Sequence, residues 1–256
     1  MRWWPWVLGF LLAALLGAVA LWSARDGDEA RGSDASSQTF ADDFEGAAMA
    51  WRQGDTVGSW HVQYDSYGHV GLSGRGSLDL APQVADDPDT THAALVTSTQ
   101  RFTGDIDITV RAQTIHQLRT GSPPNPWEVA WVAWHYQHDH RFYYVILRPN
   151  GWELGKVDNT KLDADGPDCL WPSYENCRFP GAQRFLATGS SPTFDVAEWH
   201  EFRISQSGDE IVLWGNGQEL TRYTDLEDPY LDGHIGLYTE DAAVSFDTIT
   251  VTGTQS

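Results

Sequence analysis

Residues 127–157 read WEVAWVAWHYQHDHRFYYVILRPNGWELGKV, and this stretch decides the fold. Over Trp127–Tyr136 and again over Phe142–Arg148, apolar and aromatic residues recur with the two-residue period of β-strands. Polar residues, then a Pro-Asn-Gly sequence, separate these segments at the points where turns are expected. The sequence therefore predicts three antiparallel strands joined by short loops, the third running from Trp152 to Val157.

Strand-like segments continue on both sides of this stretch, and no long amphipathic helix interrupts them. Asp105–Thr114 alternates clearly, and its predicted buried face carries Ile106, Ile108, Val110 and Ala112. Asn216-Gly217 is a strong hairpin turn signal, whereas Asp158–Asp195 is interpreted as a long irregular excursion. About ten to twelve strands without helices predict an all-β fold, a two-sheet antiparallel β-sandwich of the jelly-roll kind.

The N-terminus differs from the rest of the chain. Residues 3–22 are uncharged and numerous enough for one membrane-spanning helix. Arg2 precedes them, so the remainder of the chain is expected outside the cytoplasm. We interpret residues 1–22 as a signal anchor or a cleaved signal peptide, residues 23–39 as a flexible tether and residues 40–252 as the folded domain. The protein is then membrane-anchored facing the periplasm or cell exterior, or secreted if cleaved.

Charge and composition limit the partners. The formal net charge of −20 opposes binding to phosphate backbones, so we expect no nucleic acid partner. The chain has 13 Trp residues, far above ordinary usage, which serve either the core or stacking against sugar rings. Cys169 and Cys177 lie close together in a chain expected to be exported, which favours a disulfide over two free thiols.

Three segments carry a resemblance to a known superfamily. They are the opening FADDF of residues 40–44, the hairpin of residues 143–156 and the closing strands of residues 199–249. Together they resemble the concanavalin A-like lectin/glucanase jelly roll, and the last segment is similar to laminin-G-like and 3-keto-disaccharide hydrolase domains. The resemblance implies a concave sheet whose cleft contacts polysaccharide or oligosaccharide, although this architecture serves several functions.

Parity along the strands predicts which side chains face that cleft. In Phe142–Arg148, we expect Tyr143, Val145 and Leu147 to enter the core. Aromatic rings stack on sugars, while Arg, Gln and Glu bond their hydroxyl groups. The predicted substrate-binding residues are Arg111, Gln113, Trp134, Tyr136, Tyr144 and Arg148. The alternative interpretation is an ordinary half-exposed sheet face.

Catalysis remains open at this point. A glycoside hydrolase needs two carboxyl groups, and Glu128 with Glu153 is the candidate pair, although the Glu-x-Asp-x-x-Glu pattern is absent. For a polysaccharide lyase, the set resembling the jelly-roll lyases is Arg111, Gln113, His116, Tyr144 and Arg148. We therefore rank an extracytoplasmic carbohydrate-binding module first, a glycan-active enzyme using the same cleft second, and a structural or adhesion module that binds protein third.

The resemblance also implies a metal. In this superfamily a structural calcium ion often lies where the first and last strands meet, and Asp43 and Asp247 match those positions. Turn and edge capping is the alternative role for these carboxylates. No other cofactor is expected. His135, His138 and His140 cluster at a turn, where a solvated loop is favoured over a metal site.

Overall fold

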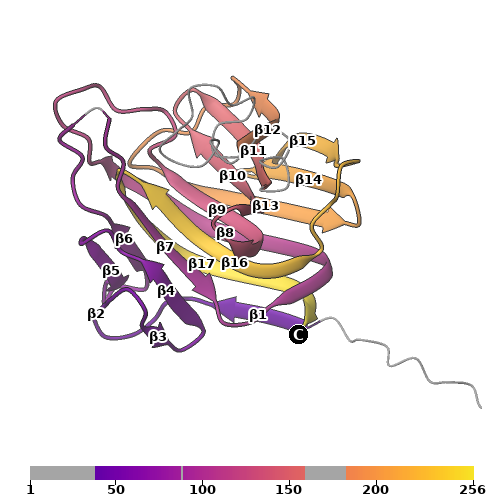
Figure 1. The fold of residues 1–256 in the computed structure, drawn as a ribbon, viewed down its shortest axis with the longest axis horizontal. Helices are drawn as coiled ribbons and strands as arrows, with labels where there is room; N and C mark the ends of the chain where they lie inside the picture. The colour runs from indigo at the N-terminus through magenta and orange to yellow at the C-terminus, as the bar shows by residue number, and fades with distance from the viewer. Residues whose placement is uncertain (1–37, 88, 159–182) are drawn as a thin grey trace, which may run out of the picture. The chain divides into compact units, whose positions relative to one another are not determined.

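The central meander has the predicted form. In the computed structural model, which describes residues 38–87, 89–158 and 183–256, it consists of β9 (Ala130–His138), β10 (Arg141–Arg148) and β11 (Gly151–Asp158). Val145 of β10 lies opposite Val132 of β9 on one side and Leu154 of β11 on the other. Both pairings are antiparallel, as short loops between consecutive strands require (Figure 1).

The strands form two antiparallel sheets, which we name sheet A and sheet B. Sheet B has the order β3 (Thr56–Val57), β4 (Trp60–Tyr64), β7 (Ala93–Ser98), β16 (Asp232–Glu240), β9, β10, β11 and β12 (Gln183–Gly189). Sheet A has the order β15 (Gln218–Thr224), β14 (Glu210–Gly215), β13 (Trp199–Ser207), β8 (Phe102–Gln117) and β17 (Ala242–Gln255). Beyond β17 follow β6 (Leu78–Ala81), β5 (His69–Leu72) and β2 (Met49–Trp51), and β1 (Gln38–Asp42) pairs with the C-terminal part of β17.

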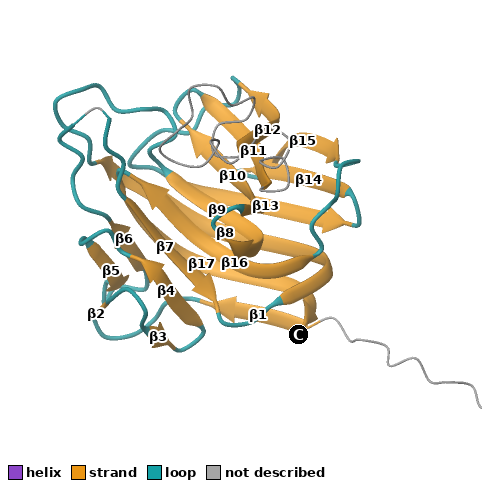
Figure 2. Ribbon diagram, in the orientation of Figure 1, coloured by secondary structure: helices purple, strands orange, loops and turns teal. Residues whose placement is uncertain are grey.

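This arrangement confirms the predicted all-β class. No helix occurs within residues 38–87, 89–158 and 183–256, where strands are joined by turns and loops (Figure 2). A short pairing of β16 with β8, at Asp232 and Gly233, joins the two sheets. Contacts along the chain place all of these strands in one compact unit, Ala35–Ser256.

The main core lies between the sheets and follows the predicted alternation. In β8, the side chains Ile106, Ile108, Val110 and Ala112 are buried in it. In β10, the inward set is Tyr143, Val145 and Leu147, as predicted. Removing such side chains from water stabilises the fold by about 1.5–3 kcal/mol each, which explains why a period of two over these strands specifies which face is buried.

The expectation that Trp134 faces a cleft is wrong. Its indole is buried in the main core, stacks on Tyr143 at 5.3 Å between ring centroids, and donates a hydrogen bond to Gln206 Oε1 at 2.7 Å. The cause is a β-bulge at His135, whose backbone has a φ of 48°. The four residues of β9 from Ala133 to Tyr136 lie opposite the three residues of β16 from His234 to Gly236, so β9 has one extra residue and its alternation changes frame there.

Two loop predictions have different outcomes. Asn216 and Gly217 have φ values of 50° and 77°, which is the two-residue turn with positive φ that was predicted for this hairpin. The excursion predicted over Asp158–Asp195, in contrast, contains the regular strand β12, which pairs with β11. Most β12 side chains are only half-buried, so their hydrophobic period is weak.

Candidate functional site

A cleft of about 920 Å³ opens on the face of sheet B that points away from sheet A. It is bordered by side chains of β9, β10, β11, β12 and β16. Beneath it lies a second, smaller apolar cluster, separate from the main core, which contains Val129, Trp131, Ala133, Tyr144 and Ile146. These residues occupy the outward positions of β9 and β10, so the period of the strands places the cleft.

A hydrogen-bonded polar group lies in this cleft. The Tyr144 hydroxyl donates to Glu153 Oε1 at 2.7 Å and accepts a hydrogen bond from Gln183 Nε2 at 2.6 Å. Arg148 forms an ion pair with the other carboxylate oxygen of Glu153 at 3.0 Å. These four residues come from three adjacent strands, β10, β11 and β12, so the sheet itself fixes their positions.

Burial governs the acid–base properties of this group. It raises the pKa of Glu153 above its ordinary value, although the Tyr144 hydroxyl and the Arg148 cation both act to lower it. Burial and the nearby Glu153 charge raise the pKa of Tyr144 as well, so its hydroxyl keeps its proton near neutral pH. A carboxylate that accepts from a Tyr hydroxyl can exchange a proton with a bound ligand through either group.

A second carboxyl group lines the same cleft. Glu240 of β16 accepts a hydrogen bond from the Tyr238 hydroxyl. Burial raises the pKa of Glu240, and the charge of the adjacent Asp241 raises it further. Together with Glu153, it gives the cleft two carboxyl groups that hold protons more tightly than exposed glutamates do.

Aromatic rings form the walls. Trp131 lies 4.8 Å from Tyr144 and 5.2 Å from Tyr238 between ring centroids, and its indole N–H donates to the Trp127 carbonyl oxygen at 2.8 Å. The two rings with the most open surface at the cleft are Trp127, 41% exposed, and Phe185, 65% exposed. Exposed aromatic rings beside buried polar groups match the requirements of a sugar ring, which has apolar faces and hydroxyl edges.

Four of the predicted site residues are brought together here, namely Tyr136, Tyr144, Arg148 and Glu153. The Tyr136 hydroxyl donates to Asp139 Oδ1 at 2.7 Å, which ties the β9–β10 turn to the cleft. Sequence reasoning missed Trp131, Gln183, Phe185, Tyr238 and Glu240. Trp131 was missed because Trp134 was expected to face the cleft, and Trp131 lies on the opposite side of the strand from Trp134. For Gln183 and Phe185, the available signal was the short alternation in residues 183–189.

Glu128 lies elsewhere and does not meet Glu153 in the cleft. It is fully buried, forms an ion pair with Arg119 at 2.5 Å, and accepts a hydrogen bond from Asn125 at 2.8 Å. Arg119 also contacts Asp241 at 2.6 Å. This buried cluster joins the loop before β9 to the start of β17, so the geometry assigns Glu128 to the framework and not to a catalytic pair with Glu153.

Arg111 and Gln113 do not reach the cleft either. Both lie on β8, which belongs to sheet A, and they point to the face away from the core. Gln113 donates to the Ala197 carbonyl oxygen at 2.6 Å, and Arg111 forms an ion pair with Asp247. Both side chains point outward, but from sheet A, whereas the cleft lies on sheet B.

The residues proposed for calcium do not fit a calcium site. Asp247 is engaged by the Arg111 cation, and Asp43 Oδ1 accepts a hydrogen bond from the Glu45 backbone N–H at 3.2 Å. Calcium requires six or more oxygen ligands. Among the described residues, no group of three or more His, Cys, Asp or Glu side chains is arranged to hold a metal ion.

Two predictions fall outside the described residues. Cys169 and Cys177 lie in 159–182, and the hydrophobic run lies in 1–37. Within the part of the chain that the structure describes, no helix is long and apolar enough to cross a membrane.

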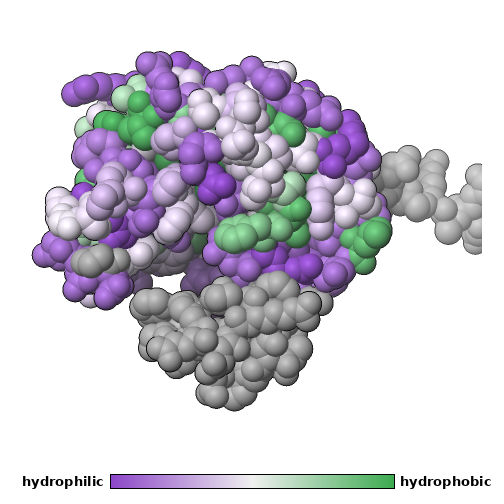
Figure 3. Space-filling model, turned by 90° about the horizontal axis from the view of Figure 1, so that it is seen from above, coloured by the Kyte–Doolittle hydropathy of each residue, from purple (hydrophilic) through white to green (hydrophobic). Residues whose placement is uncertain are grey.

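The face of the molecule seen in Figure 3 is mostly hydrophilic, with small separate hydrophobic patches, in accord with the net charge of −20.

Comparisons with known proteins bear on the family and the fold of this chain. The family model of the 3-keto-alpha-glucoside-1,2-lyase-like domain matches residues 54–252. No curated protein sequence matches significantly. Solved structures match at low sequence identity, which bears on the fold alone, and three of them are described here.

The exoplasmic/lumenal domain of VIP36, in its Ca2+/Man3GlcNAc-bound form, has a TM-score of 0.50 at 11% identity, with 75% of this chain and 82% of that chain covered. Rv0315 of Mycobacterium tuberculosis, described as an immunostimulatory antigen and pseudo beta-1,3-glucanase, has a TM-score of 0.49 at 14% identity, covering 84% and 98%. The carbohydrate-binding module CBM66 from Bacillus subtilis has a TM-score of 0.44 at 13% identity, covering 67% and 92%. The predicted concanavalin A-like jelly roll is thereby confirmed.

Proposed function

This chain belongs to the 3-keto-alpha-glucoside-1,2-lyase-like domain family, and we propose that it binds carbohydrate in the cleft on the outer face of sheet B. The observation that carries the proposal is the composition of this cleft. Exposed Trp127 and Phe185 rings stand beside the hydrogen-bonded group of Tyr144, Glu153 and Arg148. A sugar offers apolar ring faces to the former and hydroxyl groups to the latter.

The polar group suits hydroxyl recognition because its members are already ordered. The backbone pairings and mutual hydrogen bonds hold Glu153 and Tyr144 in place, so binding orders few new side chains. Sugar hydroxyls donate to carboxylate oxygens and accept from guanidinium and amide N–H groups, and Glu153, Arg148 and Gln183 supply these partners.

A binding experiment tests this proposal. Titration of the full chain with neutral and acidic oligosaccharides, followed by calorimetry, is expected to find a ligand. Trp127→Ala should weaken its binding about tenfold, since one stacked aromatic contributes about 1–3 kcal/mol by analogy with base stacking. Trp214→Ala is the control, because Trp214 also has solvent-accessible surface but does not line the cleft. Unchanged affinity in Trp127→Ala, or capture of a protein and no glycan, would reject the cleft as a carbohydrate site.

A second candidate function is 1,2-elimination on a 3-keto-glucoside, which the raised pKa of Glu153 and its bond to Tyr144 favour. The C3 carbonyl acidifies the C2–H bond. In such a reaction a base removes the C2 proton, a C1–C2 double bond forms, and the C1–O bond breaks as the leaving oxygen is protonated. In this proposal, ionised Glu153 accepts the C2 proton and the Tyr144 hydroxyl donates a proton to the leaving oxygen; the hydrogen bond between these two groups supports the assignment.

Turnover separates binding from elimination. Glu153→Gln keeps the shape of the side chain but removes the proton acceptor. If the chain is an eliminating enzyme, this variant should retain ligand binding within a few fold and lose product formation by about 10²-fold or more, as for other acid–base residues. The readout is the ultraviolet absorbance of the conjugated 3-keto-1,2-ene product. If the parent chain binds the ligand but forms no such product, elimination is rejected and only the binding function is supported.

The location of the protein is part of the proposal. We propose that the hydrophobic run of residues 3–22 exports the chain and that the domain works outside the cytoplasm, either anchored or released. Cell fractionation and N-terminal sequencing of the mature protein distinguish the two forms. Recovery of the full-length chain from the cytoplasm would contradict export.

A further inference from the structure

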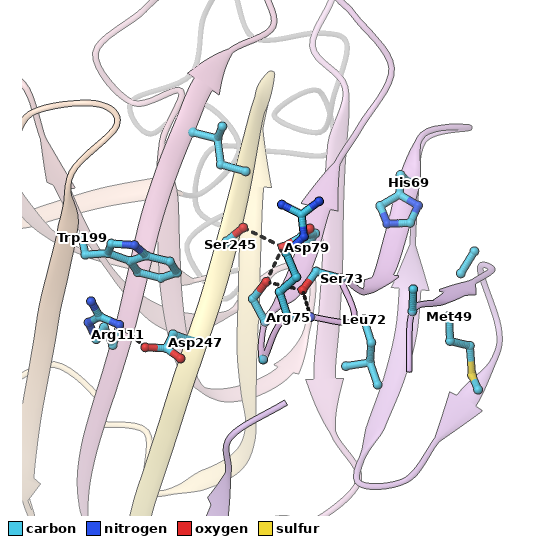
Figure 4. A pocket seen from close by; sticks show the side chains of 15 residues that line it. Met49, His69, Leu72, Ser73, Arg75, Asp79, Arg111, Trp199, Ser245 and Asp247 are labelled. Carbon is cyan, nitrogen blue, oxygen red and sulfur yellow. Dashed lines mark hydrogen bonds and ion pairs between the residues drawn. The ribbon is translucent and has the colours of Figure 1, made fainter. Parts of the chain in front are cut away.

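We infer that the chain has a second carbohydrate-binding site, on the opposite side of the sandwich from the cleft. A groove of about 750 Å³ lies on the outer face of sheet A. Trp199 of β13 and Arg111 of β8 lie on one side of it, and β6, β5 and β2 lie on the other, with β17 between (Figure 4). We name it the β17 groove. It shares no residue with the cleft on sheet B.

An ordered carboxylate lies in the groove. Asp79 Oδ1 accepts hydrogen bonds from Ser245 at 2.6 Å and from Ser77 at 2.9 Å, and Ser77 is also bonded to Ser73 at 2.8 Å (Figure 4). These hydroxyl groups come from β17 and from the β5–β6 turn, so they fix the carboxylate from two sides. Among the described residues, Asp79 Oδ2 has no hydrogen-bond donor and the exposed Arg75 has no ion pair, which leaves an acceptor and a donor for a ligand.

An aromatic side chain completes the groove. The Arg111 guanidinium lies 4.5 Å from the centroid of the Trp199 ring and forms an ion pair with Asp247 (Figure 4). Asp247 reaches this position through a β-bulge, because Phe246 pairs with Ala112 and Thr248 with Arg111, which leaves one extra residue in β17. Arg111 thus covers one face of the indole and fixes its orientation, so a sugar ring would stack on the other face.

The balance of charges identifies the ligand as a neutral saccharide. Two arginines and two aspartates line the groove, so it carries no excess positive charge to hold a polyanion. The chain as a whole has a net charge of −20, which repels anionic polymers. Carboxylate and guanidinium groups in equal number beside an oriented Trp fit the hydroxyl groups and apolar ring face of an uncharged sugar.

Two sites on opposite faces have a consequence for polysaccharide binding. The main core separates them, so one short oligosaccharide cannot occupy both. A chain should therefore bind two short ligands, and it can link two polysaccharide strands or two distant parts of one. Binding to the polymer then gains avidity that neither site has alone.

Calorimetric titration of the full chain with neutral glucose hexasaccharides (cellohexaose, laminarihexaose and maltohexaose) tests this site. We expect about two ligands per parent chain, and about one per chain of Trp199→Ala, whose groove should bind about tenfold more weakly or not at all. Asp79→Asn, which removes the negative charge but keeps the shape of the side chain, should weaken ligand binding at the same site. Trp214→Ala is the matched control: Arg203 covers its ring at 4.6 Å, as Arg111 covers Trp199, yet Trp214 lines neither site.

The variants separate this inference from the proposed function. Ligand binding that Trp127→Ala abolishes and Trp199→Ala leaves intact would overturn the β17 groove and keep the cleft. Binding that only Trp199→Ala and Asp79→Asn reduce would support the groove and reject the cleft. No binding of any hexasaccharide would overturn the groove, as would a Trp214→Ala loss equal to that of Trp199→Ala. Thermal unfolding of each variant shows whether it is folded.

Discussion

His135 is buried in an unusual way, and its replacement should change how stability depends on pH. Both ring nitrogens are inaccessible to solvent and have no hydrogen-bond partner within the described part of the chain. Burial lowers the pKa of this imidazole from 6.5 to about 4, and the charge of Asp232 offsets only part of that effect. The folded protein therefore holds His135 neutral at a pH at which the unfolded chain has already bound a proton.

The size of the effect follows from the two pKa values. Each unit of difference between the two pKa values corresponds to about 1.4 kcal/mol. Titration of His135 therefore makes the free energy of unfolding about 3 kcal/mol lower at pH 4 than at neutral pH. Because the folded pKa is the lower one, this stability is fully present above pH 6.5. It is lost as the pH falls from about 6.5 to about 4.

The assay is urea unfolding of the parent and of His135→Asn between pH 7.5 and pH 4. Asn is chosen because it tolerates the positive φ of 48° better than most residues and does not titrate. Other groups titrate equally in both proteins, so the difference in their pH dependence isolates His135. The parent should lose about 3 kcal/mol more than the variant over this range. Parallel curves would refute the burial of a neutral imidazole.

Further predictions concern stability, each measured by urea unfolding at pH 7.5. Trp134→Ala should lower the free energy of unfolding by about 3–5 kcal/mol, because it empties a core position and leaves Gln206 Oε1 without its donor. Glu128→Ala should lower it by about 3–5 kcal/mol, since it removes one buried carboxylate that neutralises Arg119. Gly217→Ala should lower it by about 1 kcal/mol through its φ of 77° alone, because an added Cβ meets nothing within 4 Å. A loss below about 1 kcal/mol in Trp134→Ala would mean that the indole is not in the core.

The faces of the strands were predictable where alternation ran unbroken. Ile106 to Ala112 in β8 and Tyr143 to Leu147 in β10 lie in the core as expected, because one slip of register would expose every one of these side chains. The prediction of which side chains face outward failed in β9, where the bulge at His135 inserts one residue. A bulge leaves little trace in the sequence, since the residues around it remain aromatic or apolar on both faces.

The site was only partly predictable for a different reason. Alternation tells inward from outward but does not say which sheet a strand joins. Arg111 and Tyr144 both point outward, yet β8 lies in sheet A and β10 in sheet B, so the two residues lie on opposite faces. Sheet membership depends on pairings between strands distant in the chain, such as β8 with β17, which no local pattern encodes.

The two outer faces offer different chemistry, and this bears on the choice between binding and catalysis. In the cleft of sheet B, burial raises the pKa of both Glu153 and Glu240, so protons can be held and exchanged there. In the β17 groove, Arg111 neutralises Asp247 and two serines engage Asp79. These contacts fix the donors and acceptors with which the groove would recognise sugar hydroxyl groups. If the chain cleaves a glycan, we therefore expect the reaction in the cleft, where the pKa of both glutamates is raised, and the groove would hold the polymer near it.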